Sequence, residues 1–193
     1  MRSLLRLFFT INLGLITAGC LAPQVAMNHR ERGDSMVSHG HYDSAIYYYD
    51  RAINENANDW RAYSGRSRAR SHSIDLDQRP SDKPGADLTG ALANSDRAIA
   101  LCPDGHQLYL NRGVIRTVAG QYSDALADME HAARLDPADG LTHGYRGFVL
   151  LYLRRDAEAQ AEFDRCAQLA PVSRGVLPRY IQRIKQIRDA TPT

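Results

Sequence analysis

The 193-residue chain has none of the short motifs that usually accompany catalysis or metal binding. It contains no phosphate-binding Walker loop, no Gly-x-Ser-x-Gly elbow and no His-Glu-x-x-His pair. Its three cysteines do not show the paired spacing of a zinc site. The best metal candidate is the run His39-Gly40-His41, which has no evident third ligand. The sequence therefore predicts a protein that is not an enzyme and that uses no metal and no cofactor.

The chain also lacks a long apolar run and, once its N-terminus is removed, an excess of charge. The longest mostly apolar stretch, residues 7–16, is about half of the roughly 20 residues that a membrane-spanning helix needs. Loss of residues 1–19 removes Arg2 and Arg6, which lowers the basic count from 24 to 22, equal to the 22 acidic residues. Net charge therefore gives no support for a nucleic-acid partner.

The N-terminus has the pattern of a secretory signal peptide. A short basic start is followed by the apolar stretch 7–16 and then by the small residues Thr17, Ala18 and Gly19. Cys20 comes next, and residues 16–20 resemble the lipobox of bacterial lipoproteins. That resemblance implies that residues 1–19 are removed and that Cys20 becomes the lipidated first residue of the mature chain.

The same resemblance predicts where the protein lies. Residues 20–25 would form a short tether, and Leu21 after the cysteine favours the outer membrane, with the chain facing the periplasm. Thr17 stands where a leucine is usual, so ordinary signal cleavage with secretion into the periplasm stays open as the alternative.

One phrase recurs in the rest of the chain. Residues 40–53 and 120–137 share glycine, tyrosine and two alanines at the same offsets, with a bulky residue between the alanines. This phrase resembles the tetratricopeptide repeat, a helix-turn-helix unit with a period of 34 residues. The resemblance implies an all-α fold, a right-handed α-solenoid of four such repeats closed by a C-terminal capping helix.

The repeats can be placed in one frame along the chain. We predict the following units: repeat 1, 26–59; repeat 2, 60–105, with an inserted loop at 75–86; repeat 3, 106–139; repeat 4, 140–173; an amphipathic capping helix, 175–189; and a tail, 190–193. Cys102 and Cys166 fall in non-adjacent repeats, too far apart for a disulfide, and are predicted to be buried thiols.

An arginine occupies position 7 of every repeat, as Arg32, Arg66, Arg112 and Arg146. A recurring arginine suggests ligand binding, but a structural interpretation is stronger. Asp128 and Glu162 stand at the matching place on the second helices of repeats 3 and 4. We expect the arginines to pair with these acids across each hairpin, because an unpaired buried acid would be costly.

The resemblance also implies a binding surface. In this family the first helices line a concave groove, which receives an extended peptide. The family positions that face it give a predicted peptide groove made of Arg61, Arg68, His72, Gln107, Asn111, Tyr145, Phe148 and Tyr152. It would be basic at one end and aromatic at the other, which suits a peptide with an acidic and an apolar part. Alternatively, the aromatic residues of repeat 4 hold the C-terminal helix or a second copy of the chain.

One subtype of groove is excluded by the residues present. Clamps for chaperone tails resemble this fold but need lysine and asparagine at positions 5 and 9 of one repeat. Repeat 1 has Arg30 and Asp34 at those positions, so the clamp pattern is absent.

Two functions follow from these patterns. The first is a non-enzymatic scaffold or adaptor, anchored to the bacterial envelope through Cys20, that binds a protein or peptide partner. It resembles short repeat lipoproteins that recruit cell-wall hydrolases or assist pilus and secretion assembly. The alternative is a self-associating structural subunit of an envelope complex, which would form a homo-oligomer.

Overall fold

The computed structural model describes residues 27–71 and 87–190. The predictions that fall outside these residues are the signal peptide 1–19, Cys20, the tether 20–25, His72, the inserted loop 75–86 and the last residues of the tail. No helix within the described ranges is long and apolar enough to cross a membrane.

The described residues form nine α-helices and one 3₁₀ turn. Their bounds are α1 His29–Ser38, α2 Tyr42–Glu55, α3 Trp60–Ser71, α4 Leu88–Leu101, α5 His106–Val118, α6 Tyr122–Leu135, α7 Gly140–Tyr152, α8 Asp156–Leu169, η2 Pro171–Gly175 and α9 Leu177–Ala190. Several helices begin at a side chain that accepts a hydrogen bond from the first turn, as Asn28, Asp87 and Asp139 do for α1, α4 and α7.

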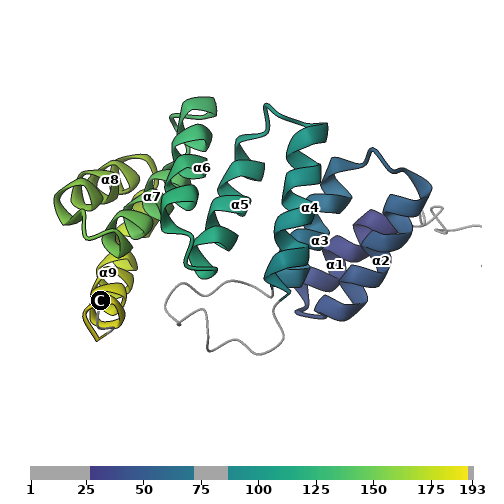
Figure 1. Cartoon of the computed structure of the whole chain (residues 1–193), viewed down its shortest axis with the longest axis horizontal. Coiled ribbons are helices and arrows are strands. Elements are labelled where there is room, and N and C mark those ends of the chain that lie inside the picture. Colours follow the sequence, from purple (N-terminus) through teal and green to yellow (C-terminus); the bar gives the residue numbers. More distant parts are fainter. Residues whose placement is uncertain (1–26, 72–86, 191–193) are drawn as a thin grey trace, which may run out of the picture.

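The helices pack as successive antiparallel pairs, each stacked on the next (Figure 1). The pairs are α1 with α2, α3 with α4, α5 with α6 and α7 with α8, and the second helix of each pair also packs on the first helix of the next. The first helices α1, α3, α5 and α7 are therefore neighbours along one side of the array. This arrangement confirms the predicted all-α solenoid of four helix-turn-helix repeats with an additional C-terminal helix.

Small residues at position 8 let the two helices of each repeat approach. A β-carbon on Gly113 would meet Met129 Cε at 2.9 Å, and one on Gly147 would meet Phe163 Cε1 at 2.5 Å. In repeat 2 the two helices approach through small polar side chains instead, and Ser67 Oγ lies 2.7 Å from Ser95 Oγ. In each case the facing residue at position 24 matches the space that position 8 leaves.

The predicted pairing of the position-7 arginines is confirmed in repeats 3 and 4. Arg112 makes two hydrogen bonds to Asp128, of 3.0 and 2.6 Å, and Arg146 lies 2.7 Å from Glu162. Only 4% of the Asp128 side chain is exposed, and Arg116 donates to it as well, at 2.8 Å. This buried carboxylate is fully compensated by two guanidinium groups.

Two of the position-7 arginines also reach back to the preceding repeat, which the sequence pattern did not predict. Arg112 donates to Asp96 on α4 at 2.6 Å, and Arg66 donates to Asp50 on α2 as well as to Asn94 on α4. Burial by itself lowers the pKa of Arg112, but its hydrogen bonds to Asp128 and Asp96 raise it above the ordinary arginine value. Arg112 and Arg66 thus join their own repeat to the one before.

The C-terminal segment differs from its predicted bounds. The capping helix was expected to begin at residue 175, but Pro171–Gly175 form a 3₁₀ turn and α9 begins at Leu177. Ser173 closes that turn, because its hydroxyl donates to Ala170 O at 2.6 Å. The turn lets α9 pack on α7, where Ile184 is completely buried.

The two described cysteines are free thiols, in agreement with the expected lack of a disulfide between them. Cys166 is buried as predicted. The prediction that Cys102 is buried is wrong, because Cys102 caps the C-terminus of α4 and lies half-exposed beyond its last turn.

The buried carboxylate of Asp128 gives a first testable prediction. Asp128→Asn removes the buried carboxylate that Arg112 and Arg116 share, which leaves Arg112 with Asp96 alone, and should lower the free energy of unfolding by about 3 kcal/mol. Asp96→Asn removes a carboxylate that is 60% exposed and should cost less than about 1 kcal/mol. Urea denaturation of both variants measures the difference, and equal losses would contradict the assignment.

Phe148 gives a second prediction, because it lies between α8 and α9. Its ring centroid is 5.3 Å from that of Phe163 and 6.1 Å from that of Tyr180. Phe148→Ala should destabilise the fold by about 3–5 kcal/mol. It should also raise amide exchange along α9 more than along α1, and uniform exchange changes would show that Phe148 does not hold α9.

Candidate peptide groove

The first helices of all four repeats contribute to one hollow of about 380 Å³. It is lined by Val37, Tyr42, Arg68, Ser71, Gln107, Leu110, Asn111, Val114, Ile115, Leu141 and Tyr145. These residues come from α1 to α3, α5 and α7, so the hollow spans the array rather than belonging to one repeat. Its size is that of a small ligand pocket or of a few residues of an extended chain.

One wall of the hollow is apolar. Leu110 forms its floor and is almost fully buried, whereas Leu141 at its edge is 56% exposed. Tyr145 is half-buried beside it, and burial together with the nearby Tyr180 raises the pKa of the Tyr145 hydroxyl. The exposed leucine beside other apolar groups thus offers apolar surface that a bound molecule or another chain would cover.

The other side of the hollow carries polar groups with weak internal bonds. Gln107 Nε2 lies 3.3 Å from Asn111 Oδ1, and Asn111 Nδ2 lies 3.4 Å from Ser64 Oγ. Both distances exceed the usual range for a hydrogen bond, so a ligand backbone could replace these contacts at little cost. Arg68 is exposed at the same hollow, and no ion pair within the described part of the chain involves it.

Four of the eight predicted groove residues lie together in this hollow: Arg68, Gln107, Asn111 and Tyr145. Arg61 lies at the start of α3, outside the hollow, with its guanidinium 4.4 Å from the ring of Trp60. His72 falls outside the described residues.

The two remaining predictions need correction. Phe148 is only 8% exposed, because Phe163 and Tyr180 cover it, so it cannot contact a peptide in the groove. Tyr152 stacks on Tyr122 of α6, with ring centroids 4.8 Å apart. Phe148 thus packs against the C-terminal helix, which is one of the alternatives that the sequence left open, whereas the stack of Tyr152 on Tyr122 joins α7 to α6 and was not predicted.

The sequence pattern also missed part of the hollow. Val37 and Tyr42 line it from repeat 1, and neither belongs to the predicted set. Val37 stands at position 12 of its repeat, one of the positions that face the groove, so the repeat frame could have found it. Tyr42 begins a second helix, where the frame predicts no groove contact.

The motif His39-Gly40-His41 shows no metal site. His39 Nδ1 lies 2.7 Å from Ser35 O, and the two imidazole rings stack 6.5 Å apart. Within the described residues, no three side chains of His, Cys, Asp or Glu are grouped as metal ligands.

Comparison with known proteins agrees with this architecture, although no family model matches the chain. Tetratricopeptide repeat protein 36 of Bos taurus is 37% identical over 87 residues, which cover 43% of this chain and 46% of that protein. The chain thus spans about half the length of this curated relative.

Two solved structures share the fold at low identity. MamA from Desulfovibrio magneticus has a TM-score of 0.61 at 18% identity, over 76% of each chain. The first tetratricopeptide-repeat domain of Spaghetti (RPAP3), bound to an HSP90 peptide, has a TM-score of 0.57 at 19% identity, over 65% of this chain and 93% of that domain. In its repeat sequence and its fold, the chain thus resembles tetratricopeptide-repeat proteins.

Proposed function

We propose that this protein is a non-enzymatic adaptor that holds an extended segment of a partner polypeptide in its concave groove. The observation that carries the proposal is the hollow shared by all four repeats, with exposed Leu141 at one side and exposed Arg68 at the other. An apolar side chain of the partner would bury Leu141, and an acidic one would pair with Arg68.

The groove amides suit an extended backbone. Gln107 and Asn111 are four residues apart on α5, so both project from one face of the helix. Each side-chain amide offers a donor and an acceptor, the two groups that an extended segment presents along its length.

The comparison with the peptide-bound domain supports a peptide ligand but not the same one. The solved domain of RPAP3 is bound to an HSP90 peptide. In this chain positions 5 and 9 of repeat 1 are Arg30 and Asp34, which pair with each other at 3.0 Å. Because this arginine is neutralised, repeat 1 does not offer the chaperone-tail clamp, and a partner peptide would be held by other residues of the groove.

The adaptor interpretation is favoured over the self-associating subunit. That alternative relied on the aromatic side chains of repeat 4 as a contact for a second copy. Phe148 is instead covered by α9, and Tyr152 is stacked on Tyr122. The aromatic surface that a second copy would need is thus largely used within the chain.

The location belongs to the same proposal. The signal pattern 1–19 and Cys20 support a lipoprotein anchored in the bacterial envelope, facing the periplasm from the outer membrane. An adaptor there would serve cell-wall hydrolases or pilus and secretion assembly. Ordinary cleavage, which would release the chain into the periplasm, stays the alternative.

A paired substitution tests the groove. Arg68→Glu with Leu141→Ser should abolish the retention of envelope proteins by the mature chain, because it reverses one contact and removes the other. Both side chains are exposed, so the variant should keep its helical circular dichroism.

The matched control changes the same residue types outside the hollow. Arg97→Glu with Leu135→Ser alters an exposed arginine and an exposed leucine of α4 and α6. Retention that survives in the groove variant, or that is lost equally in the control, would contradict the proposed site.

The anchor has its own test. Cys20→Ser should remove the acceptor for lipid and shift the protein from the membrane fraction to the soluble envelope fraction, as fractionation and immunoblotting would show. A chain that is soluble before the substitution would support ordinary cleavage instead.

A further inference from the structure

Helix α3 carries a polar stripe beside the hollow. Arg61, Ser64 and Arg68 are spaced three and four residues apart, so they share one face of the helix. Both arginines are exposed, and Ser64 between them is linked to the groove residue Asn111. The stripe therefore runs along the same side of the array as the groove amides.

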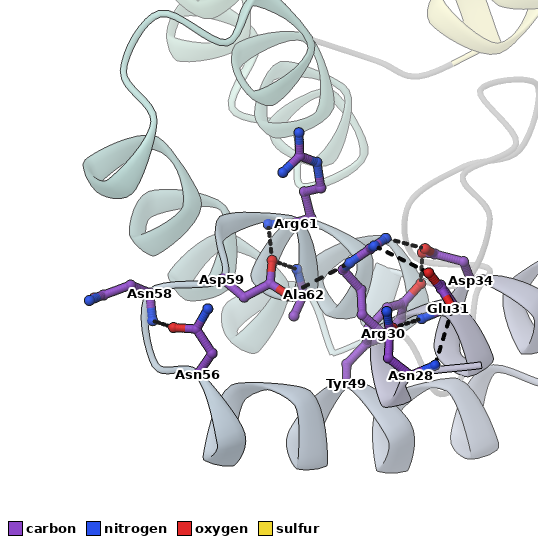
Figure 2. A network of polar contacts seen from close by, with 10 residues as sticks. All are labelled: Asn28, Arg30, Glu31, Asp34, Tyr49, Asn56, Asn58, Asp59, Arg61 and Ala62. Carbon is purple, nitrogen blue, oxygen red and sulfur yellow. Dashed lines mark hydrogen bonds and ion pairs between the residues drawn. The ribbon is translucent and has the colours of Figure 1, made fainter. Parts of the chain in front are cut away.

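The acidic residues nearest to this stripe are already engaged. Asp34 accepts the Tyr49 hydroxyl at 2.7 Å through Oδ1 and Arg30 at 3.0 Å through Oδ2 (Figure 2). Burial and the Asp34 hydrogen bond raise the pKa of Tyr49, and a hydrogen bond with Arg68 opposes them, so Arg68 contacts this network through a neutral hydroxyl and not through a carboxylate. Asp34 thus has its charge and both oxygens committed within repeat 1.

Asp59 is engaged in a different way. Its Oδ1 accepts the backbone N–H groups of Arg61 and Ala62 at 3.0 and 3.2 Å, which caps α3. Its Oδ2 faces Arg30 Nε at 3.7 Å. Figure 2 shows the Arg61 side chain pointing away from this network, with its guanidinium joined to none of the residues drawn.

The other arginines of α3 make a useful contrast. Arg66 pairs with Asp50, and Arg70 lies 3.4 Å from Asp87. Within the described ranges no carboxylate lies within ion-pair distance of Arg61 or Arg68. Two of the four arginines on this helix are therefore internally neutralised, and the two on the groove side are not.

The distance between Arg61 and Arg68 along α3 determines how far apart two acids of a ligand must lie to reach both. Seven residues of α-helix rise about 10.5 Å. A chain in the extended polyproline II conformation advances about 3.1 Å per residue with three residues per turn, so two side chains three residues apart lie on one face, about 9 Å apart. An extended segment with two acids at that interval would place one carboxylate at each arginine.

We propose that α3 recognises a pair of side-chain carboxylates, three residues apart, on the segment that the groove holds. This inference rests on the proposed adaptor function and names the chemistry of its partner: an acidic, extended peptide that also carries an apolar residue for Leu141. The mature chain has equal numbers of acidic and basic residues, so the attraction is local to this stripe.

Selection from a displayed library of random dodecapeptides tests the proposal. The detergent-solubilised mature chain serves as bait at low ionic strength, and counter-selection on the Leu141→Ser variant removes peptides that bind outside the groove. Selected peptides should be enriched in two acids at an interval of three. Arg61→Gln and Arg68→Gln should each weaken their binding about threefold to fivefold, and Arg97→Gln should not.

The outcomes separate the two claims. Groove-dependent peptides without the acid pair, or peptides that bind both glutamine variants as tightly as the unsubstituted chain, would overturn the inference and leave the adaptor function standing. Enrichment of acid pairs at another interval would overturn the extended geometry. If no selected peptide depends on Leu141, the groove itself is not a peptide site and both proposals fail.

Discussion

The position-7 arginines are the interaction on which the array depends. Each repeat packs through small and bulky side chains, but such packing tolerates sliding between neighbours. A guanidinium that bonds one acid in its own repeat and another in the repeat before prevents such sliding, because its donors lie in a fixed plane. Arg112 does this through Asp128 and Asp96, and at the junction before it Arg66 bonds the amide of Asn94 and the carboxylate of Asp50. They matter most around repeat 2, whose helix pair meets through Ser67, Ser95 and Asn94 rather than through large apolar residues.

The groove depends on the alignment of neighbouring repeats that these arginines fix. Its lining comes from helices that are distant in the sequence, so a shift of one repeat would separate Arg68 from Asn111 and Tyr145. Which arginines are paired with acids, and which are not, also determines the chemistry of the groove. The position-7 arginines of repeats 2 to 4 are neutralised by Asp50, Asp96, Asp128 and Glu162. On the groove side of α3 the guanidinium groups have no such partner within the described residues, and there a ligand can supply the charge.

The sequence predicted what local periodicity controls and missed what distant segments decide. The fold, the arginine–acid pairs within repeats and four groove residues follow from positions within a 34-residue frame. Phe148 could not be placed from that frame, because Tyr180, which covers it, lies 32 residues later in a helix outside the repeats. Likewise, Arg30 and Asp34 occupy groove positions but neutralise each other, a fact that depends on side-chain geometry. Arg61 faces the same side of α3 as Arg68 but lies beyond the hollow.

The central claim is that the concave groove, and not another surface, holds the partner polypeptide. Photo-crosslinking in intact cells tests it most directly. A photoreactive phenylalanine analogue would replace Leu141 in one strain and Leu135, which is exposed outside the hollow, in another. The account predicts a discrete covalent adduct with another polypeptide from position 141 that is absent from position 135. An adduct from position 135 alone, or the same adduct from both positions, would contradict it.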